Sequence, residues 1–449
     1  MPEPPRSSVM RTHFRVTAAT AVVLSVVLTG CGGGDGGDTA AKGPVTVTYW
    51  TWDEPKTVQP VADKFNATHD TIRVKVVKQA DNPGTAANLR NVVASGKGVP
   101  CLVKNFGQVP GLVGEGLLSD VGDEVEPYVR KGVFNEASLL GAQAGGRYYS
   151  VPIGYQPSFM VINRKIYDQY GIAVPRTWDD LIEAGKKLKK HGIHVMNLAG
   201  EDPSTLENLV QQAGGSWFAT EGDTWKVDFL SPESLKAADV VQRLVDNGLV
   251  ANQTYMDRPA LINYFDSGKM VSLPTQVWQL GNYELNYKKS LGDWEPIDLP
   301  QFKDAPSFTA PAHGTGLLVP KGCAHPKEAV EAAVWMNTTK EGIDASYQKD
   351  IKQYNWPGAI PDPSPWVDSA VPDKLFGDRK GEARKVILKA VEGAKDTWVV
   401  GPNYTGVFAE LQDQWAKVVT RKMTMRQALA HMQKFTVDDL KSKNINVEG

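Results

Sequence analysis

The chain has 449 residues, and its 49 Lys and Arg against 51 Asp and Glu give a formal net charge of −2 at pH 7. This balance leaves no basic excess to attract nucleic acid, so we expect no nucleic-acid partner. With 41% hydrophobic and 22% charged residues, the composition is that of an ordinary globular protein. The length exceeds what one hydrophobic core usually supports, so we expect two or more domains.

Residues 1–30 have the pattern of a secretory signal peptide. Three arginines precede an apolar run from Val16 to Leu28. That run is shorter than the roughly 18 residues that a transmembrane helix needs, so we expect a cleaved segment rather than a membrane span. Both Met1 and Met10 remain open as the start of translation.

The sequence Leu28-Thr-Gly-Cys31 follows the apolar run and resembles the lipobox of bacterial lipoproteins. The resemblance implies that Cys31 is lipidated and becomes the mature N-terminus, which anchors an extracytoplasmic protein to the cell membrane. The next residues are mostly glycine and cannot form a core, so 31–43 is predicted to be a flexible tether. A short anchor helix with an incidental cysteine is the alternative.

From residue 44 onward, strand and helix patterns alternate along the chain. Such alternation is typical of α/β folds, with parallel sheets covered by helices on both faces. Strands are predicted at 45–49, 72–76, 102–103 and 159–162, and helices at 58–65, 89–93, 181–188, 235–244, 329–336 and over most of the last hundred residues. Thr177 and Asp180 are predicted to cap the third of these helices.

The chain contains none of the common catalytic motifs. It has no G-x-S-x-G elbow, no H-E-x-x-H, no Walker loop and no C-x-x-C. His191 and His194 are close in sequence, but they follow a Lys-rich helix end and no third metal ligand accompanies them. We therefore expect no metal, no cofactor and no enzymatic activity.

Tryptophan is the distinctive residue, with 12 in the chain. The apolar C–H faces of a sugar ring stack on aromatic rings, while its hydroxyls need Asp, Asn, Gln or backbone partners. Loop and strand-end positions suggest a binding cleft for Trp50, Trp52, Trp217, Trp278 and Trp356. Helical spacing places Trp178, Trp335 and Trp415 in the core.

The stretch GGRYYSVPIGYQPSFMVINRKIYDQYGIAVPRTWDDLIEAGKKL, from Gly145 to Leu188, resembles the central signature of extracellular solute-binding proteins of the maltodextrin-binding type. Its G-R-x-Y, Pro152, Asn163 and the T-W-D-D-L helix start fill the places of that signature. Later segments agree in order, namely F-D-S-G-K-M before Trp278, a G-T-G-L-L-V return strand and the C-terminal helices. The resemblance covers the whole chain after the tether.

The resemblance implies an α/β periplasmic-binding-protein-like fold with two lobes and a hinge between them. Lobe one would comprise 44–153 and 308–355, and lobe two 154–307 and 356–449. The protein would act as a monomer that captures a mono- or oligosaccharide and delivers it to the permease subunits of an ABC importer. By position, the ligand contacts would be Trp50, Trp52, Asp53, Gln79, Asn105, Tyr155, Trp217, Trp278, His313, Thr315, Trp356 and Tyr404.

The chain departs from the family pattern at two places. Pro100-Cys101 stands where Pro-Asp is common, and the family fold would bring Cys323 near Cys101. The resemblance thus implies a possible Cys101–Cys323 disulfide, with two free thiols as the alternative. Ile162 stands where tyrosine is usual, which removes one possible ligand contact.

Two other classes of function stay open. A surface-tethered carbohydrate-active enzyme would need a carboxylate pair, for which Asp53 and Glu54 are the candidates. A sensor, or a binding protein for a non-sugar solute, would share the fold. A polyamine would call for several acidic contacts and an anion for arginine, whereas the predicted contacts include one acid, Asp53, and no arginine.

Overall fold

A computed structural model describes residues 43–80, 82–106, 109–305, 307–395 and 398–449. The chain divides into the units Met1–Gly43 and Pro44–Gly449, and the second unit contains the described strands and helices. The predicted signal peptide, the lipidation site Cys31 and nearly all of the tether lie outside the described residues. Within the described ranges, no helix combines the length and the apolar character needed to cross a membrane.

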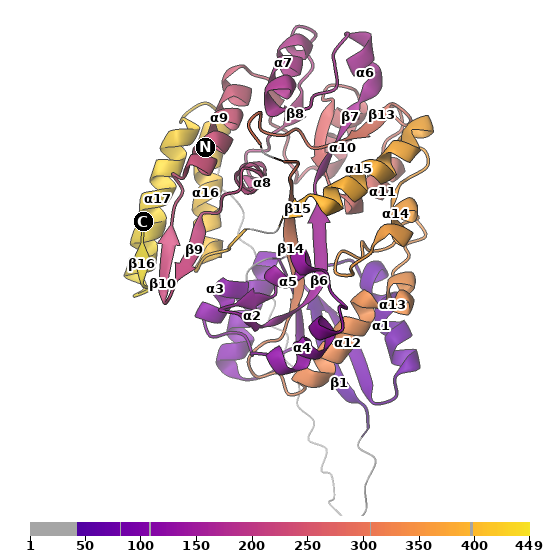
Figure 1. Ribbon diagram of the computed structural model, residues 1–449, viewed down its shortest axis with the longest axis vertical. Coiled ribbons are helices and arrows are strands. Elements are labelled where there is room, and N and C mark those ends of the chain that lie inside the picture. The colour runs from indigo at the N-terminus through magenta and orange to yellow at the C-terminus, as the bar shows by residue number, and fades with distance from the viewer. Residues whose placement is uncertain (1–42, 81, 107–108, 306, 396–397) are drawn as a thin grey trace, which may run out of the picture. The chain divides into compact units, whose positions relative to one another are not determined.

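A six-stranded sheet organises lobe one (Figure 1). Its strands run in the order β15-β14-β3-β1-β2, and β6 also pairs with β14. β1 is parallel to β2 and β3, whereas β14 is antiparallel to β3 and β6. The strands are β1 (Val45–Thr51), β2 (Ile72–Lys78), β3 (Leu102–Phe106), β6 (Ser150–Pro157), β14 (Ala310–Leu318) and β15 (Ala394–Lys395).

Helices cover both faces of this sheet because successive side chains of each strand point to opposite faces. Leu102 and Leu317 belong to a core on one face, and their neighbours Val103 and Leu318 belong to a second core on the other. Around the sheet lie α1 (Pro55–Thr68), α2 (Asn82–Ser95), α3 (Val109–Gly114), α4 (Gly122–Arg130), α5 (Glu136–Leu140), α12 (Pro326–Thr338) and α13 (Lys340–Ala345), with the hairpin β4 (Gln143–Ala144) and β5 (Arg147–Tyr148).

Lobe two is built around a smaller sheet of β12 (Ser272–Thr275), β7 (Phe159–Asn163) and β13 (Trp294–Ile297). Both pairings in this sheet are antiparallel, so the prediction of parallel sheets is wrong here. The alternation of strand and helix patterns does not fix the direction of pairing, and β7 pairs with two strands that lie far from it in sequence, β12 and β13. Two small sheets complete the lobe. One pairs β8 (Met196–Asn197) with β11 (Val250–Ala251), and in the other β10 (Thr224–Val227) lies between β9 (Phe218–Glu221) and β16 (Val447–Glu448).

Side-chain caps mark the starts of several helices of lobe two. Thr177 and Asp180 form a capping box at the start of α7, and Ser231 caps α9. Thr424 and Gln427 form a second box on α17. The helices are α6 (Arg164–Gln169), α7 (Trp178–Lys189), α8 (Ser204–Gln212), α9 (Pro232–Asp246), α10 (Arg258–Asp266), α11 (Val277–Asn286), α14 (Ser364–Ala370), α15 (Lys380–Glu392), α16 (Tyr404–Val419) and α17 (Met425–Ser442), and the turn η1 (Gly377–Arg379) precedes α15.

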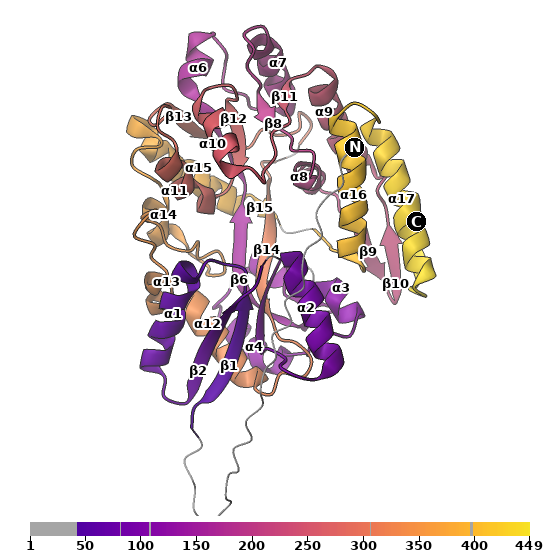
Figure 2. The ribbon, with the colours of Figure 1, turned by 180° about the vertical axis from the view of Figure 1, so that it is seen from behind.

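Two paired strands, β6 and β14, pass from one lobe to the other, and they lie side by side in both views (Figures 1 and 2). Ala310 at one end of β14 packs in a core of lobe two, while Leu317 at the other end packs in lobe one. Because one strand contributes side chains to the cores of both lobes, the structure does not fix the residue at which one lobe ends and the other begins. The lobe boundaries expected from the sequence therefore stay a prediction.

A third segment crosses beside these strands through Gly358. A Cβ added there would lie 2.4 Å from the carbonyl oxygen of Tyr155, and one added at Gly154 would lie 2.7 Å from the Cα of Gly358. Gly154 also has a positive φ of 136°. Only residues without side chains allow the two backbones to approach this closely.

Cys101 and Cys323 form a disulfide, with 4.8 Å between their Cα atoms and a separation of 222 positions in sequence. The antiparallel pairing of β14 with β3 brings the two cysteines together, since Cys101 precedes β3 and Cys323 follows β14. This is the pairing that the family resemblance implies, and it joins two distant segments of lobe one.

Candidate functional site

The candidate site is a cavity of about 940 Å³ in lobe two, beside the crossover strand β14. Its walls come from α8, α10, α11, the start of α16 and the strand β12, and Gly314 of β14 completes it. Aromatic rings in the wall include Tyr255, Trp278, Tyr283, Trp398, Tyr404 and Phe408. Side-chain amides include Asn197, Asn208, Asn263, Gln276, Gln279 and Asn282. A wall of rings and amides suits a ligand with both apolar faces and hydroxyl groups.

Trp278 is the most accessible aromatic ring of this wall. Its side chain is 45% exposed, although Trp is usually well buried in folded proteins. It lies in the first turn of α11, and its indole Nε1 donates a hydrogen bond to Oε1 of Gln276 at 2.9 Å. An exposed ring held at one edge offers a stacking surface to a ligand.

Glu207 brings a buried carboxyl group to the same wall, with only 5% of the residue exposed. Burial raises its pKa to about 8, and the nearby charge of Asp202 acts in the same direction. The hydroxyl of Tyr404 donates a hydrogen bond to Oε1 at 3.2 Å, which lowers the pKa but does not offset burial. At neutral pH Glu207 is therefore largely protonated, so it offers hydrogen bonds without a full charge.

Charged residues near the cavity differ from the sequence expectation. The wall contains Arg258 at the first position of α10, where the predicted contacts had no arginine. It also contains Asp202 and Glu207, where the predicted contacts had one acid, Asp53. The sequence analysis identified neither acid. Glu207 in particular looks like an ordinary acid in the first turn of a helix, and such acids are usually exposed.

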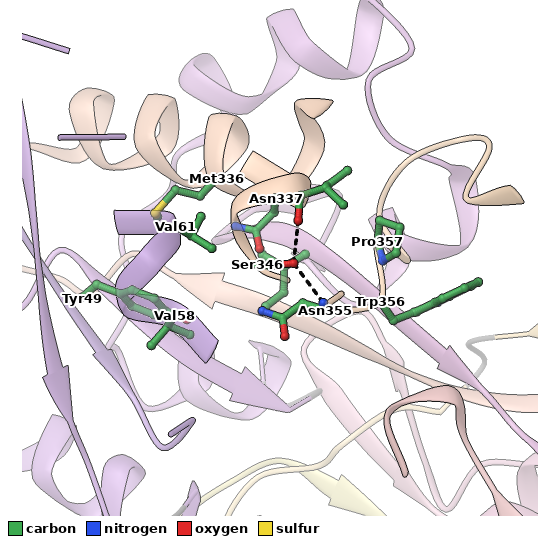
Figure 3. Close-up of a pocket in the computed structure, with 11 residues that line it drawn as sticks. Tyr49, Val58, Val61, Met336, Asn337, Ser346, Asn355, Trp356 and Pro357 are labelled. Carbon is green, nitrogen blue, oxygen red and sulfur yellow. Dashed lines mark hydrogen bonds between the residues drawn. The ribbon is translucent and has the colours of Figure 1, made fainter. Parts of the chain in front are cut away.

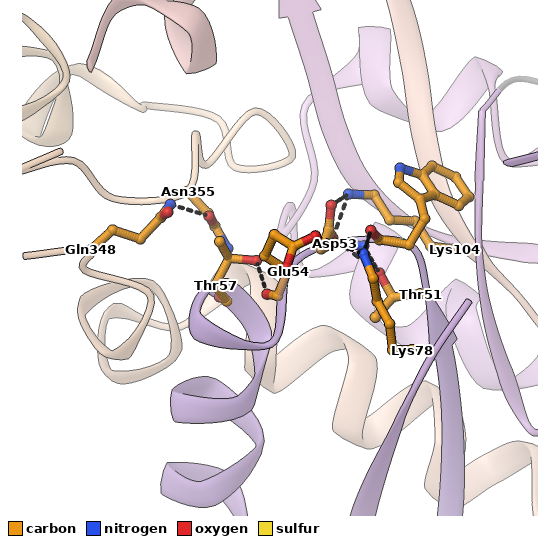
Figure 4. Close-up of polar contacts among 9 residues, drawn as sticks. Thr51, Asp53, Glu54, Thr57, Lys78, Lys104, Gln348 and Asn355 are labelled. Carbon is orange, nitrogen blue, oxygen red and sulfur yellow. Dashed lines mark hydrogen bonds and ion pairs between the residues drawn. The ribbon is translucent and has the colours of Figure 1, made fainter. Parts of the chain in front are cut away.

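The strand-end loop of lobe one carries a cluster of ion pairs (Figure 4). Both carboxylate oxygens of Asp53 lie 2.6 Å from Nζ of Lys104, which also lies 5.3 Å from the centre of the Trp52 ring. Nζ of Lys78 binds the backbone oxygen of Trp52 and lies 3.0 Å from Oε1 of Glu54. Both carboxylates that could have served an enzyme are thus bound to lysines that the sequence analysis did not single out.

The other predicted contacts from lobe one and the crossover strands do not line the cavity. Trp50 is half-buried and packs against the core that contains Leu89. Gln79 accepts a hydrogen bond from Asn88 at 3.0 Å. Asn105 on β3 and Tyr155 on β6 are buried, and Thr315 on β14 is half-buried. His313 also belongs to β14, but its side chain is not among those that the structure describes.

Two tryptophans predicted for the cleft lie in the core instead. Trp217 is 2% exposed, stacks on Phe229 at 4.6 Å and donates from Nε1 to Oγ of Ser234 at 3.1 Å. It also meets Trp398 edge-on at 4.9 Å, so it supports a ring of the cavity wall from behind. The prediction was wrong because Gly214 and Gly215 suggested an open loop, whereas the following chain folds over the indole.

Trp356 is the second such residue, at 7% exposed, and its ring packs in the core of lobe two. It also borders a small cavity of about 50 Å³ with Tyr49, Val58 and Met336 (Figure 3). There the backbone N–H of Asn355 donates to Oγ of Ser346 at 2.9 Å. This space is far smaller than the roughly 300 Å³ at the lower end of ligand pockets.

Of the predicted contacts, Trp278 and Tyr404 line the large cavity. Within the part of the chain that the structure describes, no group of three or more His, Cys, Asp or Glu side chains could hold a metal ion.

Residues 49–343 match the model of the family described as bacterial extracellular solute-binding protein. An arabinooligosaccharide-binding protein of Halalkalibacterium halodurans is 26% identical over 246 residues, 53% of this chain and 54% of that protein. A melibiose/raffinose/stachyose-binding protein of Bacillus subtilis is 28% identical over 201 residues, 42% of this chain and 44% of that protein. The matched part spans about half the length of these relatives.

Solved structures agree with the two-lobed fold. The galacto-N-biose/lacto-N-biose I-binding protein of a Bifidobacterium longum ABC transporter, in complex with lacto-N-biose, superimposes with a TM-score of 0.77 at 24% identity. The match covers 91% of this chain and 100% of that one. The GacH receptor of Streptomyces glaucescens matches with a TM-score of 0.68 at 19% identity, over 89% of this chain and 99% of that one. With a family model matched over most of its length, the chain belongs to the bacterial extracellular solute-binding protein family.

Proposed function

We propose that this protein captures a carbohydrate in the cavity of lobe two and delivers it to an ABC importer. The observation that carries the proposal is the 45% exposed Trp278 in a cavity whose wall contains both aromatic rings and side-chain amides. Apolar sugar faces stack on such rings, and sugar hydroxyls take hydrogen bonds from such amides. The arabinooligosaccharide-binding and melibiose/raffinose/stachyose-binding relatives support the same class of ligand.

The size of the cavity favours an oligosaccharide over a monosaccharide. Its volume of about 940 Å³ lies near the upper end of small-molecule sites, which range from roughly 300 to 1,000 Å³. A single sugar ring would leave much of the wall in contact with water. We therefore propose a ligand of two or more sugar units.

Closure of the lobes would complete the site. The crossover strands β6 and β14 and the Gly358 segment form a hinge of the kind that absorbs domain rotation. Rotation about it would bring the strand-end residues Trp50, Trp52 and Asp53 toward the cavity. Within the proposal, these residues contact the ligand only in the closed form.

The proposed setting is the outer face of the cell membrane. The lipobox at Cys31 and the glycine-rich tether would hold a monomer close to the permease, outside the cytoplasm. Neither Asp53 nor Glu54 lines the cavity, and each is bound to a lysine, so the two carboxylates do not form a pair across it, which argues against the enzyme alternative.

A melting-temperature screen of the full-length chain tests the ligand class. Neutral oligosaccharides, acidic sugars, polyamines and amino acids would each be added in excess. A ligand at 100 times its dissociation constant stabilises the folded state by about 2.7 kcal/mol, which raises the melting temperature by several degrees. A shift with neutral oligosaccharides supports the proposal. A shift confined to polyamines, through Asp202, or to acidic sugars, through Arg258, would replace the ligand class.

A further inference from the structure

The side chain of Gln276 connects the exposed Trp278 ring to the hinge. Its Oε1 accepts the indole N–H of Trp278 at 2.9 Å. Its Nε2 donates to the backbone oxygen of Gln156 at 3.0 Å and lies 3.3 Å from Oγ of Ser158. Both ends of one amide are therefore used, one on the cavity ring and one on the chain of β6.

This arrangement differs from an ordinary helix cap. Gln276 occupies the N-cap position of α11, yet its side chain makes no capping hydrogen bond to the helix. An N-cap side chain normally accepts from the second or third backbone N–H of the helix, which stabilises the helix end. The sequence here forgoes that stabilisation, and the amide holds Trp278 instead.

An exposed tryptophan without such a bond would exchange between side-chain rotamers. Each immobilised side chain costs about 0.5–1.5 kcal/mol of conformational entropy upon ligand binding. A hydrogen bond to the indole N–H leaves fewer orientations open, so the ring is already placed when the ligand arrives. The bond also uses the polar edge of the ring and leaves its apolar faces for stacking.

The other end of the amide fixes the ring relative to the crossover strands. Gln156 of β6 pairs with His313 of β14, and the next residue of β14, Gly314, lines the cavity. Ser158 lines the cavity as well. The ring is thus held relative to the strands about which the lobes would rotate.

We infer that Gln276 is a positioning residue that fixes the orientation of the Trp278 ring against the crossover strand β6. The inference rests on the proposed function only for its effect on ligand affinity. The orientation of the ring in the free protein is independent of what the ligand is.

The ring orientation is tested first, without ligand, by fluorine NMR of the full-length chain labelled with 5-fluorotryptophan. The resonance that disappears in Trp278→Phe belongs to Trp278. We expect one narrow resonance in the unaltered protein and a broadened or split one in Gln276→Met, which keeps the length of the side chain but loses both hydrogen bonds. Gln276→Ala serves if the methionine variant does not fold. Gln59→Met is the matched control, since Gln59 is exposed on α1 and its side chain donates a hydrogen bond to Asp63, away from the cavity wall.

Affinity for an oligosaccharide found in the screen gives the second readout, in a double-mutant cycle. Gln276→Met should weaken binding by about three- to tenfold, the usual range for one hydrogen bond. The same change made in the Trp278→Phe background should alter affinity by less than about twofold, because phenylalanine has no N–H to hold.

An unchanged, narrow Trp278 resonance in Gln276→Met would overturn the inference. So would an equal loss of affinity in the two backgrounds, which would mean that Gln276 contacts the ligand itself. If no carbohydrate binds the unaltered protein, the proposed function fails, and the fluorine resonance alone still decides whether Gln276 positions the ring.

Discussion

The hydroxyl of Tyr404, at the start of α16, donates a hydrogen bond to the buried carboxyl group of Glu207 on α8 at 3.2 Å. The two residues are 197 positions apart in sequence, and both line the cavity. Burial is the largest influence on this carboxyl group, and its pKa rises to about 8.

This shift predicts how stability depends on pH. In the unfolded chain Glu207 ionises near its ordinary pKa of 4.5, whereas in the folded protein it keeps its proton up to about pH 8. Its contribution to stability is therefore fully present below pH 4.5 and is lost as the pH rises toward 8. At pH 7 this effect lowers the free energy of unfolding by about 3 kcal/mol. Glu207→Gln keeps an acceptor for Tyr404 and cannot ionise, so it should remove this loss.

Urea denaturation at pH 4.5 and pH 8 measures the effect. Glu207→Gln should differ little from the unaltered protein at pH 4.5 and should be clearly more stable at pH 8. Glu183→Gln, at an exposed position of α7, is the control and should change neither value much. Equal pH dependence of Glu207→Gln and the unaltered protein would contradict the pKa assigned to Glu207.

Removal of the Trp278 ring should weaken ligand binding without unfolding the protein. Trp278→Ala loses the stacking surface, and we expect a loss of affinity of about fivefold or more, because a buried aromatic contact contributes about 1 kcal/mol or more. Leu285→Ala is the matched control, since Leu285 is 46% exposed on the same helix and does not line the cavity. Isothermal titration compares the two, and equal affinities would count against Trp278 as a contact.

The backbone crossing at Gly358 should not tolerate a side chain. The Cβ of Gly358→Ala would lie 2.4 Å from one backbone oxygen and 2.7 Å from one backbone nitrogen of Tyr155, so the two crossing segments must separate. Overpacking of this kind typically costs about 1–3 kcal/mol. Gly381→Ala has open space around it on α15, and it should leave stability unchanged or raise it by up to about 1 kcal/mol. Urea unfolding that ranks the two variants in the opposite order would refute the close approach.

The disulfide between Cys101 and Cys323 closes a segment of 222 residues, so its removal should be costly. Cys101→Ala combined with Cys323→Ala should lower the free energy of unfolding by about 2–5 kcal/mol. A non-reducing peptide map of the unaltered protein should contain the linked peptides. Recovery of both thiols in alkylated form would show that the bridge does not form.

Much of the fold could be predicted because its signals are local. Period-two alternation located β1 and β2, and the pair Thr177 and Asp180 located the start of α7. The family resemblance supplied the antiparallel return strand, and with it the pairing of Cys101 and Cys323. The antiparallel sheet of lobe two was missed because its pattern of buried residues is the same in either direction of pairing.

The cavity was harder to predict because it depends on long-range packing. Trp217 and Trp398 both lie in loops, but Trp217 packs in the core and Trp398 lines the cavity. Glu207 reads as an exposed helix acid, and only the approach of α16 buries it. No local pattern separates these cases, since each side chain is placed by contacts with other segments, which are 12 and 17 residues away for Trp217 and 197 residues away for Glu207.

The most direct test of the account is a crystal structure of the full-length protein with the oligosaccharide that stabilises it most. The account predicts a sugar ring stacked on Trp278 within the cavity of lobe two, with amides of the same wall bonded to its hydroxyls. A ligand bound elsewhere, for example in the separate groove of about 870 Å³ lined by Arg176, Asp298 and Lys389, with Trp278 left in solvent, would contradict it.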